Sequence, residues 1–529
     1  MKANFRMLLT AFGCIVSLPA AAQVLPPNQT TSPWFSDAES AVAAKPQTAG
    51  PGVAKNVILF VGDGMGISTL TASRIYEGQL AGNPGEEGYL SFESFPNTAL
   101  VKTYNVNAQT PDSAGTMTAM MSGLKTDVGV IGVDEDIVRG DCTTVEGNEV
   151  VTYLELAEIA GMSTGVVTTA RITHATPAAT YAKSADRNWE DISDMPPAAV
   201  DAGCEDIASQ LVNFEKNLEA RYAGIDVDGI EVAMGGGRRH FLPNDPAFNS
   251  PDARSSTEGD RTDGRNLVEE WQTQYPDGAY VFDQSGFDAL DPASTERVFA
   301  LFNESHVQYE SDRANDIAGE PSLTEQTMAA IDILDSNPNG FFLMVESGRI
   351  DHAHHAGSAV GALIDTLEFA SAVQAAVDAT DASETLILVT ADHSHVFTIA
   401  GYPKRGNPIL GPVVAVGGTE PVEALDGKPY TTLGYNNGLG FRDLGVETDA
   451  DASYASDPVV GRDGQDLSLI DTQSPGFHQE TLVPLGSETH SGEDISLHAY
   501  GPGSYVVQGE IEQNVVFHVM NQARSLIED

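Results

Sequence analysis

The segment NVILFVGDGMG (residues 56–66) is an apolar run that ends in an acidic residue flanked by glycines. It is rich in Val, Ile, Leu and Phe without regular alternation of polar and apolar positions, which is typical of strands buried on both faces. Three other segments share this design: STGVVTTARITHAT (163–176), FFLMVESG (341–348) and TLILVTADHSH (385–395). Together they predict a sheet that is covered on both sides.

Helical patterns separate these runs, as in VVTYLELAEIAGM (150–162) and GALIDTLEFASAVQAAVDA (361–379). Strands that alternate with helices predict an α/β fold with a doubly wound, mostly parallel central sheet flanked by helices. Ligands bind such sheets at the carboxyl ends of the strands. The four runs end in residues that can bind metal: Asp63, His174 with Thr176, Glu346, and Asp392 with His393. We therefore expect one shared site at this edge.

The remaining segments predict additions to this core. Between 401 and 489 Gly and Pro become frequent and helical periodicity fades, which predicts an inserted subdomain; 53–400 and 490–529 then form the α/β core. Residues 23–52 are polar and contain Pro, and we expect an N-terminal arm there.

The N-terminus has the pattern of an export signal. Lys2 and Arg6 precede a short apolar run, and small residues at 20–22 favour cleavage near Ala22/Gln23. We expect residues 1–22 to be removed and the protein to reach the periplasm or the medium. The rest of the chain has no apolar run of about 18 residues, so no membrane anchor is expected.

The chain is strongly acidic, with 27 Lys and Arg against 76 Asp and Glu and a net charge of −49. Nucleic acid is not an expected partner, because phosphate backbones bind basic surfaces. The acidic residues are dispersed along the chain, which predicts a solvated surface of a halophilic kind. Cys142 and Cys204 remain after cleavage; an exported protein favours one disulfide, and two free thiols are the alternative.

Several residues form metal-binding patterns. Asp351 and His355 are four apart and share one face if a helix starts there. Asp392 and His393 are adjacent at a strand end, and the glycines around Asp63 let the backbone approach an ion. Asp with His suits zinc, whereas oxygen-only ligand sets suit magnesium.

TPDSAGTMTAMMSG (110–123) places Ser113 at the predicted start of an amphipathic helix. The free N–H groups and the dipole at a helix N-terminus stabilise an alkoxide and bind phosphate oxygens. The alternatives are that Ser113 is only an N-cap, that GDG is only a turn and that HAHH (352–355) is a solvated helix face. Their joint occurrence favours a metal-assisted site.

These motifs resemble those of the alkaline phosphatases, in particular the animal-type branch. The resemblance covers nearly the whole chain after the signal. Besides the five segments at 56–66, 110–123, 165–189, 340–357 and 385–397, it includes MGGGRRHFLP, DGRNLVEEW, GYPKRGNPILG and ETHSGED. It implies a hydrolase of phosphate monoesters that releases inorganic phosphate through a phosphoserine, with two Zn²⁺ and one Mg²⁺ per subunit.

The resemblance also implies individual roles. Ser113 would be the nucleophile, Arg187 would clamp phosphate and Asp112 would orient that arginine. The implied ligands are Asp351, His355 and His490 for the first zinc; Asp63, Asp392 and His393, joined by Ser113, for the second; and Asp63, Thr176 and Glu346 for magnesium. His174 and His352 would support the magnesium and first-zinc sites, and His395 would stand behind the second zinc. His354 receives no role. Cys142 and Cys204 match paired cysteines.

Some features depart from the family. Thr176 stands where animal members have serine, and Asn303 stands at a glutamate of their calcium site, so a fourth metal is not expected. Residues 401–489 resemble the crown that meets a second subunit, and the arm resembles one that embraces it; both imply a homodimer. The competing interpretations are a phosphodiesterase, a sulfatase and a non-catalytic phosphate- or metal-binding protein. Ser113, Arg187, Thr176 and Glu346 favour the monoesterase.

Overall fold

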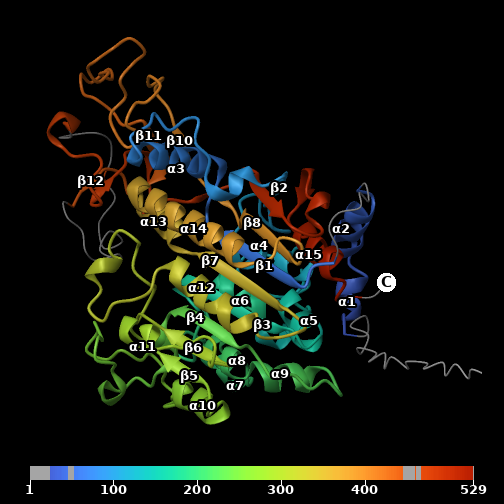
Figure 1. Ribbon diagram of the computed structural model, residues 1–529. Coiled ribbons are helices and arrows are strands. Elements are labelled where there is room, and N and C mark those ends of the chain that lie inside the picture. Colours follow the sequence, from blue (N-terminus) through green and yellow to red (C-terminus); the bar gives the residue numbers. More distant parts are fainter. Residues whose placement is uncertain (1–23, 46–52, 445–458, 460–465, 528–529) are drawn as a thin grey trace, which may run out of the picture.

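The structure, a computed structural model, describes residues 24–45, 53–444, 459 and 466–527 (Figure 1). The predicted export signal and part of the predicted arm lie outside the described residues. A ten-stranded sheet runs through the molecule. In spatial order its strands are β17 (Gly509–Glu512), β2 (Asn97–Lys102), β16 (Ile495–Tyr500), β8 (Thr385–Ala391), β1 (Asn56–Gly62), β7 (Phe341–Ser347), β3 (Ser163–Arg171), β4 (Val232–Gly236), β6 (Val298–Leu301) and β5 (Ala279–Val281).

The sheet is mostly parallel, as predicted. Every neighbouring pair from β8 to β5 is parallel, and β17 is parallel to β2. Only β16 runs antiparallel to both of its neighbours, β8 and β2. The four predicted strands are adjacent in the order β8, β1, β7, β3. In this register Gly62 pairs with both Ala391 and Ser347, so their carboxyl ends meet at one edge.

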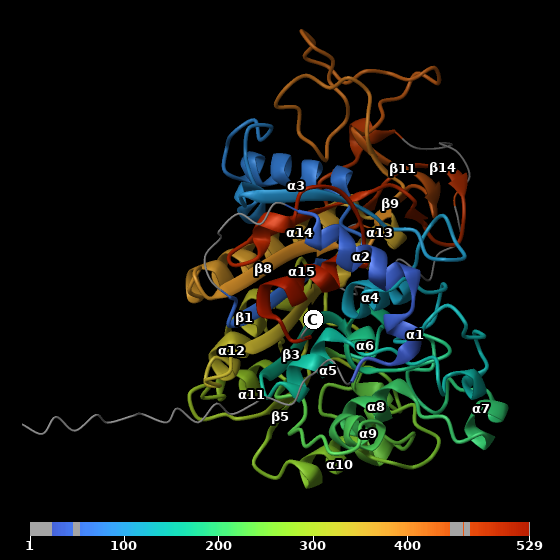
Figure 2. The same cartoon turned by 90° about the vertical axis from the view of Figure 1, so that its right-hand side faces the viewer.

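Two helix layers cover the sheet, and Figures 1 and 2 show them from two sides. One layer contains α4 (Ser113–Ser122), α5 (Tyr153–Ile159), α6 (Ala175–Tyr181) and α15 (Val515–Arg524). The other contains α3 (Ile67–Leu80), α12 (Leu323–Leu334) and α14 (Ala359–Ala379). Within the described ranges, α14 is the helix long and apolar enough to cross a membrane, but it packs on α12 and α3 as a core helix. The predicted amphipathic character of α4 is wrong, because every residue of α4 is buried between α6 and α15.

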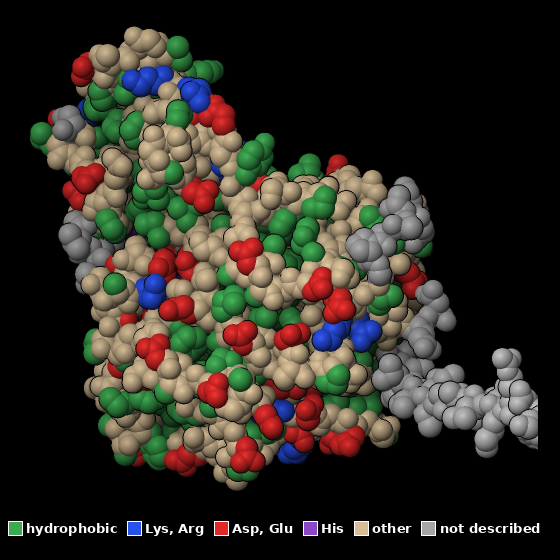
Figure 3. All heavy atoms as spheres, viewed as in Figure 1, with side chains coloured by type: hydrophobic (Ala, Val, Ile, Leu, Met, Phe, Trp, Pro, Cys, Tyr) green, Lys and Arg blue, Asp and Glu red, His purple; other side chains and the backbone are tan. Residues whose placement is uncertain are grey.

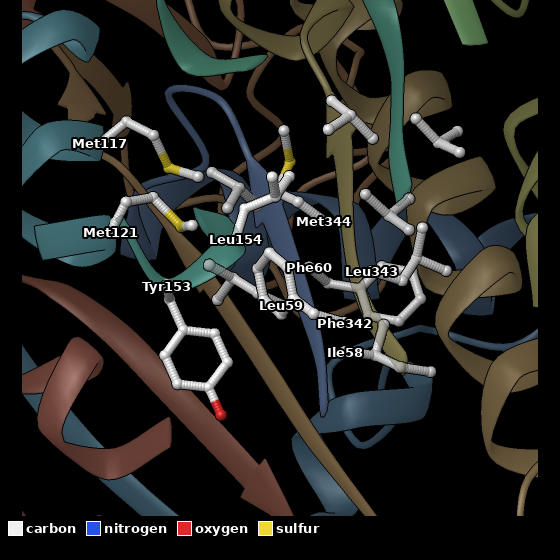
Figure 4. Close-up of a cluster of buried hydrophobic side chains, with 14 of the residues drawn as sticks. Ile58, Leu59, Phe60, Met117, Met121, Tyr153, Leu154, Phe342, Leu343 and Met344 are labelled. Carbon is white, nitrogen blue, oxygen red and sulfur yellow. The ribbon is translucent and has the colours of Figure 1, made fainter. Parts of the chain in front are cut away.

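The core lies on both faces of the central strands (Figure 4). All residues of β1 and β7 are buried, which explains the absence of alternation in their sequences. Phe60 of β1 contacts Phe369 of α14 edge to face at 5.8 Å, and Phe342 of β7 contacts Tyr153 of α5 at 5.1 Å. Each such side chain contributes about 1.5–3 kcal/mol by leaving water. The core thus holds the strand ends in fixed register.

Smaller elements surround this core. The arm carries α1 (Pro27–Thr30) and α2 (Pro33–Ala43), and α2 packs on α15. After α14, β10 (Phe397–Ile399), β11 (Leu433–Gly438) and β14 (Thr481–Pro484) form a separate sheet at the upper left of Figure 1, with β12 (Arg442–Asp443) pairing with β13 (Phe477–His478). The remaining helices are α7 (Pro197–Asp201), α8 (Ile207–Val212), α9 (Phe214–Arg221), α10 (Leu267–Gln274), α11 (Gln284–Asp288) and α13 (Arg349–Ala356).

Cys142 and Cys204 form a disulfide whose Cα atoms are 6.2 Å apart. The bond closes a loop across a sequence separation of 62 residues. Both cysteines pack against a small apolar cluster that includes Ile137, Trp189 and Ala199. The alternative of two free thiols is therefore wrong, and the bridge ties together the segments that flank β3 and α6.

Candidate active site

The candidate site lies at the carboxyl ends of β1, β7 and β8. Asp63 follows β1, Glu346 is near the end of β7, and Asp392 with His393 follows β8. All four side chains are completely buried. Helix α13 begins two residues after β7 and contributes Asp351 and His355, while Ser113 is the first residue of α4. The segments expected to share one edge therefore do so.

Asp351, His355 and His490 form the first group of possible metal ligands. On α13 the four-residue spacing brings His355 Nε2 within 3.3 Å of Asp351 Oδ1, and His490 Nε2 is also 3.3 Å from that oxygen. His355 Nδ1–H donates to the Glu488 carbonyl at 2.6 Å, and His490 Nδ1–H donates to the Pro111 carbonyl at 2.9 Å. Because Nδ1 carries the proton in each ring, both Nε2 lone pairs face Asp351, as a metal site requires.

Asp63, Asp392 and His393 form the second group. His393 Nε2 lies 3.2 Å from Asp392 Oδ2 and 3.5 Å from Asp63 Oδ1. The same nitrogen lies 3.1 Å from Ser113 Oγ. The nucleophile candidate is therefore beside this group, as expected.

Asp63 also belongs to a third group with Glu346 and His174. Thr176, on the first turn of α6, is buried nearby, and Thr168 donates a hydrogen bond to Glu346. This group offers mainly oxygen atoms, which suits magnesium. The ring of His174 offers a nitrogen to the same point as the carboxylates of Asp63 and Glu346, so His174 could contact an ion bound there.

The chemistry of these groups fits bound cations. Several buried oxygen atoms of the site have no hydrogen-bond partner among the described residues. They are both carboxylate oxygens of Asp63, Oδ2 of Asp392, Oε1 of Glu346 and Oγ1 of Thr176. A buried polar atom left in this way costs about 1–3 kcal/mol. Their shared location at one edge indicates that cations are what these oxygens bind.

The same conclusion follows from the acid–base properties of the carboxyls. Burial, together with repulsion from Asp351 and Asp392, raises the pKa of Asp63 well above its ordinary value. Burial also raises the pKa of Glu346 to about 8, although the Thr168 hydrogen bond opposes this. Carboxyls so close together do not ionise readily without positive charge beside them. Asp351 differs: burial would raise its pKa, but the imidazoles of His355 and His395 outweigh that effect and hold the pKa well below its ordinary value.

Ser113 and Arg187 lie together at the N-terminus of α4. Asp112 is the N-cap of α4, since its Oδ1 accepts the Gly115 N–H, so the alternative that Ser113 is only an N-cap is wrong. Asp112 Oδ2 accepts from Arg187 NH1 at 3.0 Å. The second terminal nitrogen of Arg187 donates to His174 Nε2 at 3.2 Å. Two neighbours thus hold the guanidinium beside the N-terminus of α4.

The expected place of His395 is wrong. The two-residue strand β9 (Ser394–His395) pairs with β15 (His490–Ser491), which places His395 opposite His490 and beside the first ligand group. Its nitrogens lie 2.8 Å from Asp351 Oδ1 and 2.5 Å from Glu488 Oε2. Burial alone would lower the pKa of His395, but these two carboxylates outweigh it and raise the pKa to about 10. Each ring nitrogen of His395 thus has a carboxylate beside it, and the contact with Oδ1 orients Asp351.

The structure gives His354 a structural role. It is completely buried, and its ring nitrogens are hydrogen-bonded to Thr69 Oγ1 at 2.9 Å and to the Tyr435 hydroxyl at 2.8 Å. The interpretation of HAHH as a solvated face is therefore wrong. His354 connects α13 to α3 and to β11, and it stacks beside His395.

A pocket of about 590 Å³ opens onto Ser113, the first ligand group and His174. Predicted residues line it, including Ser113, His174, Arg187, Asp351, His352, His355 and His490. Five residues with no predicted role also line it: Arg171, Ser305, His306, Arg349 and Ser487. Arg171 and Arg349 lie inside motifs already singled out and could have been found there. His306 follows no strand-end or metal-ligand pattern, and only the tertiary structure brings it to the pocket.

Comparisons with known proteins show which family the chain resembles. The family model for alkaline phosphatase matches residues 54–526. The tissue-nonspecific isozyme of alkaline phosphatase from Homo sapiens is 41% identical over 495 residues, which cover 93% of this chain and 88% of the human protein. An alkaline phosphatase from Gadus morhua is 41% identical over 479 residues, covering 90% of this chain and 93% of that protein.

Solved structures extend the comparison to the fold. The crystal structure of Thermus thermophilus alkaline phosphatase matches with a TM-score of 0.62 at 23% identity, covering 96% of each chain. The alkaline phosphatase of the Antarctic bacterium TAB5 matches with a TM-score of 0.56 at 22% identity, covering 90% of this chain and 100% of that one. At these identities the two structures support the fold alone.

Proposed function

Because this chain belongs to the alkaline phosphatase family and is a metal-dependent phosphomonoesterase, we propose that Ser113 is its nucleophile and Arg187 its phosphate clamp. The observation that carries this assignment is that Ser113, Arg187 and the first ligand group line one pocket, while His393 of the second group contacts Ser113 Oγ. A non-catalytic binding protein has no need of a buried hydroxyl at a helix N-terminus beside those ligands. Steady hydrolysis of p-nitrophenyl phosphate tests the function, and its absence in zinc-loaded protein would revive the binding alternative.

The residues of this chain perform distinct parts of the reaction. Ser113 Oγ attacks phosphorus while the P–O bond of the ester breaks, and the alcohol leaves with the proton of the serine hydroxyl. Water then attacks the phosphoserine, which releases inorganic phosphate and returns a proton to Ser113 Oγ. The N-terminal N–H groups of α4 and the planar fork of Arg187 bind the non-bridging oxygens. Asp112 orients Arg187. Burial would raise the pKa of Asp112, but the positive charge of Arg187 outweighs that effect and lowers the pKa.

Two Zn²⁺ and one Mg²⁺, when bound, would supply the Lewis acidity that activates oxygen nucleophiles and neutralises charge on the phosphoryl group. We assign the cation positions from the three ligand groups. Asp351, His355 and His490 would hold the first zinc, and Asp63, Asp392 and His393 the second. Asp63 and Glu346 would hold the magnesium together with the buried hydroxyl of Thr176. His174 and His352 would support them. Elemental analysis of the purified protein tests this stoichiometry, and fewer than two zinc ions per chain would contradict it.

We further infer that the protein is exported to the periplasm or the medium and acts there as a homodimer. The basic start and apolar run at residues 1–22 support export, and N-terminal sequencing that finds residue 1 retained would contradict it. Exposed apolar side chains between 401 and 489, among them Tyr402, Val416 and Leu425, support contact with a second copy. A monomeric mass by light scattering at micromolar concentration would contradict the dimer.

The acidic surface is expected to make stability depend on salt. On the face drawn in Figure 3, Asp and Glu are spread among few Lys and Arg, in line with the net charge of −49. Salt screens this repulsion, so the urea midpoint of unfolding should rise between low salt and about 1 M NaCl. KCl should give the same rise, because screening does not distinguish the two cations. A midpoint that stays constant or falls would rule out the halophilic interpretation.

A further inference from the structure

The carboxylate of Asp112 receives a hydrogen bond from a residue that the reaction above does not use. Asn105 Nδ2 donates to Asp112 Oδ1 at 2.9 Å. The same carboxylate accepts the Gly115 N–H at 3.2 Å and Arg187 NH1 at 3.0 Å, and the Gly129 N–H also faces it. The bond from Asn105 has the shortest of these three distances, and it ends on the group that orients the phosphate clamp.

The chemistry of the two side chains determines which atom of Asn105 faces Asp112. An ionised carboxylate only accepts hydrogen bonds, so the amide nitrogen of Asn105 and not its oxygen lies against it. A hydrogen bond to a charged group is about twice as strong as one between neutral groups. Asn105 is 3% exposed, and bulk water therefore does not compete for this contact.

Asn105 is itself held in a fixed position. Its backbone N–H and carbonyl exchange hydrogen bonds with Ala108 at 3.1 and 3.2 Å, and the following N–H, of Val106, donates to the Thr126 carbonyl at 3.0 Å. A Cβ at Gly115 would lie 2.5 Å from Asn105 Nδ2, so the amide fills the space that this glycine leaves on α4. The donor is thus preorganised before any ligand arrives.

The two oxygens of Asp112 have separate partners. Oδ1 accepts from Asn105 and Gly115, whereas Oδ2 accepts from Arg187. The last torsion of an aspartate is broad and has no sharply preferred angle, so the donors on Oδ1 decide where Oδ2 points. The main chain of Arg187 is held separately, because its N–H donates to the Gly129 carbonyl at 2.9 Å. Loss of Asn105 should therefore release the guanidinium and leave the backbone that carries it in place.

We propose that Asn105 is a positioning residue that acts on phosphate binding through Asp112 and Arg187. The proposal rests on the proposed function, in which Arg187 binds the phosphoryl oxygens. Asn105 is not among the described residues that line the pocket. Its effect on a ligand therefore passes through Asp112 and Arg187, and it should be an effect on affinity for the phosphoryl group.

Substitutions at Asn105 in metal-loaded protein test the proposal, with p-nitrophenyl phosphate as substrate and inorganic phosphate as inhibitor. Asn105→Ala should raise KM and the inhibition constant of phosphate by about tenfold, the lower end of the range for one hydrogen bond to a charged group. The change in kcat should be smaller than the change in KM. A purely structural defect would lower the active fraction and with it kcat, but would leave KM and the inhibition constant unchanged.

Two further variants separate hydrogen bonding from packing. Asn105→Leu has nearly the shape of asparagine but no donor, so it should bind phosphate about as weakly as Asn105→Ala. Asn105→Ser keeps a hydroxyl donor in a smaller side chain and should bind phosphate more tightly than Asn105→Leu. A packing role predicts the opposite order, with leucine closer to wild type than serine, and that order would overturn the proposal. The comparison of these two variants also decides the question if Asn105→Ala does not fold.

An Arg187→Ala background separates an effect on the clamp from any other effect. In that background Asn105→Ala should leave the inhibition constant of phosphate unchanged, because the guanidinium that Asn105 positions is absent. The same fold-change in both backgrounds would show that Asn105 acts without Arg187, and the proposal would be wrong.

Asn107→Ala is the matched control. Asn107 lies two residues further along the same loop, and its Oδ1 accepts the Val128 N–H at 3.0 Å. Its replacement should leave KM and the inhibition constant of phosphate unchanged. Normal hydrolysis with an unchanged inhibition constant in Asn105→Ala would overturn the role of Asn105 alone. Wild type that neither hydrolyses the ester nor is inhibited by phosphate would contradict the proposed function instead.

Discussion

Replacing Ser113 with alanine is expected to lower kcat for p-nitrophenyl phosphate by at least about a thousandfold, because the variant loses the only proposed attacking atom. Ser113 is 2% exposed, and its Oγ lies 3.1 Å from His393 Nε2. The methyl group of alanine keeps α4 intact, since Asp112 and not Ser113 caps the helix. The metal content should therefore stay at the wild-type value, and elemental analysis beside the kinetic assay checks that it does.

Ser122→Ala is the matched control for this variant. Ser122 ends the same helix, is equally buried, and donates to the Thr118 carbonyl away from the pocket. Its replacement should leave kcat close to wild type. Undiminished activity in fully metallated Ser113→Ala would show that another group attacks phosphorus; Ser305 and Ser487, which also line the pocket, would be the next candidates.

Much of the site could be predicted because it follows directly from strand ends. Asp63, Glu346 and Asp392 each sit where a buried strand stops, and parallel strands place their ends side by side. Asp351 and His355 could be paired because a four-residue spacing on a helix is a local property. In these cases the regular geometry of a strand or a helix determines both the sequence pattern and the position of the side chain.

Other parts could not be predicted because they depend on contacts between distant segments. His395 was expected behind the second zinc, yet the pairing of the two-residue strands β9 and β15 turns it toward Asp351. Glu488 lies within a recognised motif, but its role in orienting His395 appears only in the tertiary structure. The burial of all of α4 likewise results from packing against α6 and α15. The sequence of α4 alone does not show which helices will cover it.

Chelation of the cations is expected to abolish hydrolysis and also to make the fold less stable as pH rises from about 6.5 to 8.5. In metal-free protein the pKa of Glu346 is raised to about 8, mainly by burial, and that of Asp63 is raised well above its ordinary value. At neutral pH these carboxyls ionise in the unfolded chain while the folded chain holds their protons. The folded state then binds more protons, so its stability falls as pH rises toward the folded pKa.

Histidines with lowered pKa values act in the opposite direction, but only at lower pH. Burial lowers the pKa of His355 to about 4 and that of His174 to about 3, so both are neutral in the folded chain. Their contribution to stability increases with pH up to the ordinary histidine pKa of about 6.5 and is then constant. Above that pH the carboxyls determine how the stability changes with pH. His395 acts in the same direction, because its pKa is raised to about 10 and its stabilising effect declines as pH rises.

Urea midpoints measured at pH 6.5, 7.5 and 8.5, with EDTA and with added zinc and magnesium, check this expectation. Bound cations keep the site carboxylates ionised, so the metal-loaded midpoint should depend less on pH than the chelated one. Carboxyls outside the site, such as Glu320 with a pKa raised to about 8 mainly by burial, affect both samples equally and cancel in the difference. Glu346→Gln removes one titrating group from the site and should flatten the slope of the chelated protein alone. Equal slopes in chelated and loaded wild type would mean that these buried carboxyls are not where the cations bind.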